Sequence, residues 1–183
     1  FTSELKTYED HDFELKEFPP GSFYKSGGRV TSYFDVPWLR AETLPEDEHV
    51  HRLRQTLEDS VYKRLMSDVP LGTFLSGGLD SSIISALTAK RIEGLHTFVV
   101  GLPGSGDLPA AQLVADHIGS NHHIYHLTKK EIMEKLPDII YHLESFDQDL
   151  VRSAVPCYFT SRMAAQEVKV ILTGEGADEI FGG

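Results

Sequence analysis

Residues 76–82, Ser-Gly-Gly-Leu-Asp-Ser-Ser, have the composition of a phosphate-binding loop. Two glycines let the backbone approach phosphate oxygens closely, and three serine hydroxyls can donate hydrogen bonds to them. The run contains no lysine, so it differs from the nucleoside-triphosphate loop that ends in Gly-Lys-Ser/Thr. It carries Asp80 instead, and a carboxylate beside phosphates calls for a divalent cation between them. The loop therefore predicts a site for phosphate and magnesium.

The segments on either side of this loop are those that a phosphate site needs. Residues 71–75 are an apolar run typical of a buried strand, and residues 82–90 have the spacing of an amphipathic helix. A strand, a glycine turn and a helix start together direct backbone N–H groups and the helix dipole at the loop. An ordinary turn rich in small residues is the alternative interpretation, and this strand–loop–helix context disfavours it.

From residue 46 onward, helical and strand patterns alternate. We expect helices at residues 46–67, 110–118, 129–143 (broken near Pro137) and 154–166. We expect further strands at residues 95–100, 122–127 and 168–172. The alternation predicts an α/β fold, a doubly wound parallel sheet with helices on both faces.

Three polar, glycine-bearing segments follow predicted strands, at residues 76–82, 101–107 and 173–179. Ligands of such sheets lie at the carboxyl ends of the strands, so the three segments are expected to converge. Their acidic residues include Asp80, Asp107, Glu175 and Asp178. Carboxylates near phosphates are suitable ligands for Mg²⁺. A structural alternative remains for each of the last two segments: Asp107 could cap the helix after it, and Glu175, Asp178 and Glu179 could stabilise the start of a last helix.

Residues 1–45 form a short β-rich segment with a different pattern. Residues 13–18 alternate like a strand, and residues 25–29 are a hairpin signal between residues 22–24 and 30–34. Residues 35–45 have the composition of a linker. A few strands cannot bury a face on their own, so we expect residues 1–45 to be the tail of a truncated β-rich domain and residues 46–183 to form a second domain, incomplete at its C-terminus.

Composition excludes several classes of function. The net charge of −11 disfavours nucleic-acid binding, and no apolar run is long enough to cross a bilayer. The single cysteine, Cys157, excludes an internal disulfide framework and a cysteine-rich zinc site; we expect it to be buried in a helix, and the cytoplasm to be the compartment. Four histidines lie close together in sequence: His117, His122, His123 and His126. Because neighbours on a strand face opposite ways, a surface or interface role is favoured over a metal site.

Four motifs in order resemble the synthetase domain of glutamine-hydrolysing asparagine synthetases, in the PP-loop ATP pyrophosphatase group. They are residues 76–82, 96–104 (His-Thr-Phe-Val-Val-Gly-Leu-Pro-Gly), 151–154 (Val-Arg-Ser-Ala) and 173–179 (Thr-Gly-Glu-Gly-Ala-Asp-Glu). The resemblance implies a PP-loop, adenine-nucleotide α-hydrolase-like fold and a glutaminase-like origin for residues 1–45. It also implies an ATP-dependent ligase that adenylates the side chain of aspartate and then forms asparagine with ammonia derived from glutamine.

The resemblance assigns roles by motif position. ATP would be held by Leu75, Ser76, Gly77, Gly78, Asp80, Ser81, Ser82, Val100, Thr173 and Gly174. Leu75 and Val100 would contact the adenosine, while Asp80 and Asp178 would bind pyrophosphate through Mg²⁺. Glu175, Arg152 and Asp107 are the candidate catalytic residues. Arg152 would clamp a carboxylate or phosphate, which a guanidinium recognises with two hydrogen bonds.

The sequence also departs from the family pattern. The family's glutaminase uses an N-terminal cysteine where this chain has Phe1, so we expect that this chain alone does not make asparagine from glutamine. Asp149-Leu150 replaces two threonines common before Arg152, which leaves the acid substrate open. A related synthetase that adenylates another carboxylate, as in β-lactam formation, and a non-catalytic nucleotide-binding remnant are the alternatives. The resemblance leaves a homodimer open.

Overall fold

The computed structural model describes residues 1–8, 14–34 and 44–181. The chain forms two units, Phe1–His51 and Arg52–Gly183. Most of the linker predicted at residues 35–45 lies outside the described residues. Within the described part of the chain, the helices are too short or too polar to cross a bilayer.

The first unit contains a small hairpin. Strand β1 (Ser22–Tyr24) pairs antiparallel with β2 (Val30–Ser32), as predicted, after a short 3-10 helix, η1 (Lys6–Tyr8). The strand predicted at residues 13–18 is wrong for residues 14–18; Phe13 lies outside the described residues. Alternation alone does not make a strand, because its backbone groups need a partner, and β1 and β2 pair with each other.

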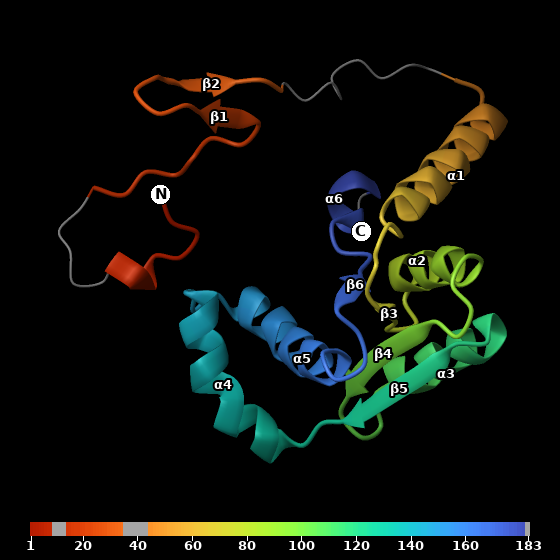
Figure 1. The fold of residues 1–183 in the computed structure, drawn as a ribbon. Coiled ribbons are helices and arrows are strands. Elements are labelled where there is room, and N and C mark those ends of the chain that lie inside the picture. Colours follow the sequence, from red (N-terminus) through yellow and green to blue (C-terminus); the bar gives the residue numbers. More distant parts are fainter. Residues whose placement is uncertain (9–13, 35–43, 182–183) are drawn as a thin grey trace. The chain divides into compact units, whose positions relative to one another are not determined.

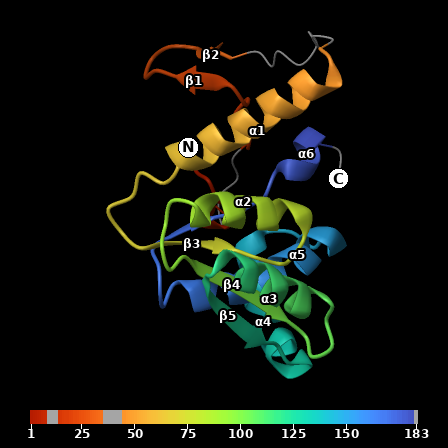
Figure 2. The same ribbon diagram turned by 90° about the vertical axis from the view of Figure 1, so that its right-hand side faces the viewer.

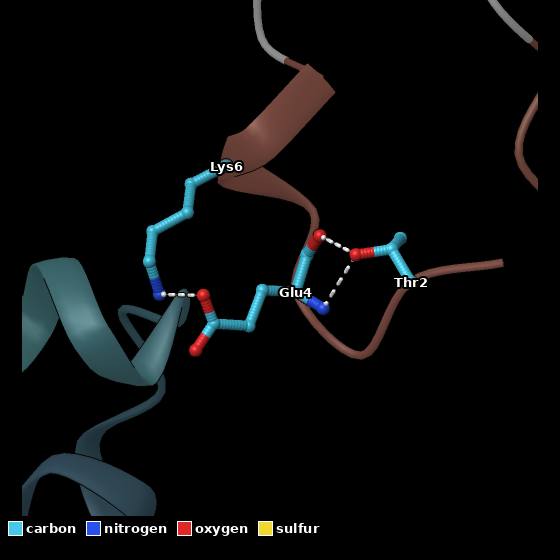
Figure 3. A network of polar contacts seen from close by, with 3 residues as sticks. All are labelled: Thr2, Glu4 and Lys6. Carbon is cyan, nitrogen blue, oxygen red and sulfur yellow. Dashed lines mark hydrogen bonds and ion pairs between the residues drawn. The ribbon is translucent and has the colours of Figure 1, made fainter.

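The first residues of this unit are joined by local polar contacts (Figure 3). The Glu4 N–H donates to Thr2 Oγ1 at 3.2 Å, and the Thr2 hydroxyl donates to the Glu4 carbonyl at 2.8 Å. The Glu4 carboxylate lies 3.1 Å from Lys6 Nζ. Because these contacts join neighbouring residues, they fix the turn before η1 but contribute little to the stability of the whole protein.

The second unit is built on a parallel sheet with the strand order β5-β4-β3-β6. The strands are β3 (Leu71–Phe74), β4 (His96–Gly101), β5 (Asn121–His126) and β6 (Val170–Leu172). The helices are α1 (Glu46–Lys63), whose first six residues belong to the first unit, α2 (Leu79–Ala89), α3 (Asp107–Ile118), α4 (Lys129–Leu143), α5 (Gln148–Ala164) and α6 (Ala177–Phe181). The predicted doubly wound parallel sheet is confirmed (Figure 1).

The order of the strands in the sheet predicts a ligand crevice beside β3. From β3 the chain passes through α2 to β4 and through α3 to β5, always moving in one direction across the sheet. After α4 and α5 it returns to the other side of β3 as β6. Crossover helices therefore leave β3 and enter β6 on opposite sides, and a ligand crevice is expected at the carboxyl ends of these two strands.

Helices cover both faces of the sheet (Figures 1 and 2). On one face, Leu75 and Val99 pack against α3, while Val61 of α1 and Leu87 of α2 form an adjoining cluster. On the other face, Phe98 packs against the C-terminal end of α5. Neighbouring residues of β4 thus point to opposite layers, and the strand is buried on both sides, as is typical of parallel sheets.

Two helices depart most from the prediction: α4 has its predicted bounds but no break, and α5 starts at a different residue. Helix α4 continues through Pro137, because its buried face, which includes Ile139, packs against α5 and outweighs the lost hydrogen bond. Helix α5 begins six residues earlier than predicted. The Asp147 carboxylate caps it by accepting hydrogen bonds from two backbone N–H groups of the first turn, both at 3.0 Å.

Candidate functional site

A polar pocket of about 320 Å³ lies at the carboxyl ends of β3 and β6, the position that the sheet topology favours for a ligand. It joins the first and third of the glycine-bearing segments. The predicted site residues that line it are Ser76, Gly78, Asp80, Ser81, Thr173, Gly174, Glu175 and Asp178. The tertiary structure therefore gathers residues that are almost one hundred positions apart in sequence.

Close backbone packing fixes the loop between β3 and α2 on two sides. Gly77 has a φ of +83°, and a Cβ there would lie 2.6 Å from atoms of Ala110 and Ala111 of α3. Gly174 approaches the loop from β6, and a Cβ there would lie 3.0 Å from the Cβ of Asp80. Glycine is required at position 77 for steric reasons, and a side chain at position 174 would make Asp80 shift by a few tenths of an ångström, so the loop's place in the pocket is set by its neighbours.

The loop hydroxyls form an internal network. Ser76 Oγ lies 2.9 Å from Ser81 Oγ, and the Ser81 hydroxyl also accepts a hydrogen bond from the Ser76 N–H at 3.2 Å. The Ser82 hydroxyl donates to the Gly78 carbonyl at 2.6 Å. Ser82 thus supports the loop's backbone from within the helix, whereas Ser76 and Ser81 line the pocket.

The start of α2 is suited to an anion. Its N-cap is Gly78, which has no side chain and makes no side-chain cap. The first N–H groups of the helix therefore remain without the hydroxyl or carboxylate that usually satisfies them. Phosphate oxygens are suitable acceptors for such groups, and the positive end of the helix dipole adds to the attraction.

The charged side chains that line the pocket are acidic: Asp80, Glu175, Asp178 and Glu179. An anion and this many carboxylates can share one pocket when a divalent cation lies between them. The described residues hold no group of three or more acidic, histidine or cysteine side chains arranged for a metal ion. A pair of carboxylates nevertheless suits Mg²⁺, because phosphate oxygens and waters complete its coordination.

Two candidate catalytic residues lie outside the pocket lining. Asp107 is the first residue of α3, after the N-cap Gly106, so it stands in the first turn and does not cap the helix. Arg152 lies inside α5, exposed, with its guanidinium 3.5 Å from the Asp149 carboxylate. Because Val155 of α5 packs near Val100, at the end of β4, the helix start that carries Arg152 lies toward the ligand edge of the sheet.

The predicted adenosine contacts, Leu75 and Val100, have buried side chains. Leu75 is fully buried against α3, and Val100 packs against α4 and α5. Their side chains are committed to the core, which leaves backbone groups for any contact with a ligand. Sequence reasoning missed Phe74, which lines the pocket one residue before the end of the strand run. Its signal was the strand's alternation, which places Phe74 and Leu75 on opposite faces.

Two histidines of β5, His122 and His123, make side-chain contacts with β4. His122 Nδ1 lies 2.8 Å from Thr97 Oγ1, and His123 Nε2 lies 2.9 Å from His96 Nδ1 on the other face, as predicted for neighbours on a strand. Burial lowers the pKa of His122, and nearby His123 lowers it further; burial and then His96 do the same for His123. Cys157, predicted to be buried, is exposed on α5, because Val155 and Phe159 face the core instead.

Comparison with known proteins shows which family has this loop, pocket and sheet. The family model "Asparagine synthase" matches residues 52–183, which include the loop, the pocket and the whole parallel sheet. The chain belongs to the asparagine synthase family. Asparagine synthetase B [glutamine-hydrolyzing] of Escherichia coli is 45% identical over 99% of this chain and 36% of its own length. An asparagine synthetase of Brassica oleracea is 40% identical over the whole chain and 33% of its own length.

A probable asparagine synthetase of Schizosaccharomyces pombe is 42% identical over the whole chain and 37% of its own length. The chain thus spans about a third of these relatives. Among solved structures, an NH3-dependent NAD synthetase from Campylobacter jejuni superimposes with a TM-score of 0.51 at 14% identity, over 71% of this chain and 58% of that one. This likeness supports the fold that the asparagine synthase family motifs implied.

Proposed function

We propose that this chain forms the ATP-using part of an asparagine synthetase, which adenylates the side-chain carboxylate of aspartate. The observation that carries the proposal is the pocket at the ends of β3 and β6, where an uncapped helix start, two serine hydroxyls and four carboxylates meet. The names of the relatives, asparagine synthetases that hydrolyse glutamine, support the choice of product.

In the proposed first step, a carboxylate oxygen of aspartate attacks the α-phosphorus of ATP. The bond from that phosphorus to the bridging oxygen breaks, giving β-aspartyl-AMP and pyrophosphate. The residues of the loop hold the β- and γ-phosphates through the N–H groups at the start of α2 and the hydroxyls of Ser76 and Ser81. Gripping the leaving group while the α-phosphorus stays open favours attack there, because catalysis is then largely positioning.

In the proposed second step, ammonia attacks the acyl carbon, AMP leaves with the bonding electrons, and a proton is lost from nitrogen. Glu175 lines the pocket, and its N–H donates to Thr173 Oγ1 at 3.2 Å; its carboxylate would accept that proton. Asp80 and Asp178 would hold Mg²⁺, which neutralises phosphate charge when it is bound. The ammonia would come from glutamine, which the relatives hydrolyse according to their names; this chain spans about a third of their length.

Exchange of labelled pyrophosphate into ATP tests the proposal, because it reports the first step alone. The full-length protein is expected to catalyse exchange when aspartate is present. Asp80→Asn should lower the exchange rate by roughly 10²–10³-fold, the usual cost of losing one charge-stabilising group. The matched control is Asp116→Asn, at an exposed position on α3 that bonds Gln112 away from the pocket lining, and its rate should stay near that of the wild type.

The alternatives give different results in the same assay. Exchange that requires a different acid, and does not occur with aspartate, would indicate a synthetase of the β-lactam-forming type. Binding of ATP without exchange in the presence of any acid would indicate a nucleotide-binding remnant, and Asp80→Asn would then have no turnover to lower.

A further inference from the structure

The first turn of α3 fits closely against two glycines at the ligand edge of the sheet. A Cβ at Gly101, the last residue of β4, would lie 2.9 Å from the side chain of Leu108. A Cβ at Gly77, inside the loop, would lie 2.6 Å from the Cβ of Ala110 and from the backbone of Ala111. Leu108 therefore packs α3 against the end of β4, and Ala110 is the residue of α3 that contacts the loop.

These contacts leave the loop little room to move toward α3. Ala111 is fully buried in a cluster with Leu75 and Val99, so α3 is anchored to the sheet beneath the loop. Packed cores transmit small changes in volume instead of absorbing them. A branched side chain such as valine at position 110 would crowd Gly77 and shift the loop, or shift α3 itself.

We propose that Ala110 is a positioning residue for the phosphate site: its small side chain sets where residues 76–82 lie against the start of α3. The inference rests on the proposed function, in which that loop holds pyrophosphate. Ala110 does not line the pocket and acts through Gly77. Asp107 lies three residues before Ala110 on the same side of α3, so the contact between Ala110 and Gly77 also fixes the distance between Asp107 and the loop.

A matched pair of variants separates positioning from stability. Ala110→Val enlarges the side chain that faces Gly77. Ala115→Val makes the same change five residues further along α3, at a residue that is 1% exposed in the cluster with Ala111 and does not line the pocket. Both variants carry the same β-branched helix residue, so their intrinsic helix costs match.

The first readout is affinity for magnesium pyrophosphate, measured by calorimetry on the full chain. Ala110→Val should weaken binding by at least about tenfold, since displacement of a binding group by an ångström is costly, whereas Ala115→Val should leave it unchanged. The second readout needs no ligand. Hydrogen exchange of the amides in residues 76–82 should be faster in Ala110→Val than in Ala115→Val, relative to exchange in the rest of the sheet.

The possible outcomes separate the positioning role of Ala110 from the proposed function. Equal affinity and equal loop exchange in the two variants would overturn the positioning role of Ala110. If the wild type does not bind pyrophosphate but loop exchange still rises only in Ala110→Val, the proposed function fails while the structural role of Ala110 stands. If Ala110→Val does not fold, Ala110→Gly, which removes the contacting methyl group, must loosen the loop, and Ala110→Ser must retain wild-type affinity; failure of either overturns the inference.

Discussion

Replacing Gly77 by alanine tests whether the loop really lies against α3. The φ of +83° places the residue in the left-handed region, where a side chain costs about 1–2 kcal/mol. The new Cβ would also lie 2.6 Å from backbone atoms of α3, which are unable to rotate away, and overpacking of this kind costs about 1–3 kcal/mol. The expected loss in the free energy of unfolding is therefore about 2–5 kcal/mol.

Gly104 provides the control that separates the two contributions. Its φ of +86° is nearly the same, but a Cβ there would meet nothing within 4 Å. Gly104→Ala should therefore cost only the backbone strain, about 1–2 kcal/mol. The difference between the two variants measures the contact between the loop and α3.

Urea unfolding followed by far-ultraviolet circular dichroism gives both values, with unchanged slopes if the transitions remain two-state. Affinity for magnesium pyrophosphate, measured on the folded variants, should fall for Gly77→Ala and stay near the wild-type value for Gly104→Ala. The reasoning is refuted if Gly77→Ala destabilises the protein no more than Gly104→Ala does, because the close approach to α3 would then be absent.

Three further predictions concern stability. Thr73 Oγ1 and Ser85 Oγ are fully buried 2.8 Å apart, so Thr73→Val alone should cost about 1–3 kcal/mol, and adding Ser85→Ala should cost less than the sum of the single changes in urea titrations. The pKa values of His122 and His123 are lowered in the folded protein, so the unfolded chain binds more protons at low pH. The free energy of unfolding should therefore decrease as pH falls below about 6.5, and a value that does not change with pH would contradict this. His122→Gln should reduce the dependence of the free energy of unfolding on pH. Thr128→Ala removes the capping box of α4 and should cost about 1 kcal/mol, detected as a lower urea midpoint at unchanged slope.

Local patterns in the sequence were sufficient to predict most of the second unit. The apolar run before the loop became β3, and the alternation of strands with helices became a parallel sheet with helices on both faces. The predictions for β3 and β4 succeeded because burial on both sides of a strand requires a continuous apolar run, whatever the neighbouring strand is. Residues 14–18 show the opposite case, since a strand with one alternating face depends on a partner that the pattern cannot identify.

Helix ends and burial depended on particular contacts. Pro137 was expected to break α4, but packing of the helix face against α5 outweighs one missing hydrogen bond. Cys157 was expected to be buried because free cysteines usually are. The face of α5 that is buried carries Val155 and Phe159 instead, so Cys157 faces solvent. Residue type gives an average preference, and the choice of buried face belongs to the tertiary structure.

For the candidate site, the sequence alone indicated the chemistry that we propose: a lysine-free loop rich in glycine and serine, with an acidic residue, predicts phosphate and a cation. Only the tertiary structure decided which segments share the pocket. The return of β6 to the side of β3 placed Glu175 and Asp178 beside Asp80, while Asp107 and Arg152 stayed outside the lining. The physical reason is that a residue's chemistry is local, whereas proximity depends on strand order and on close contacts such as that of Gly77 with Ala110, which link positions far apart in the chain.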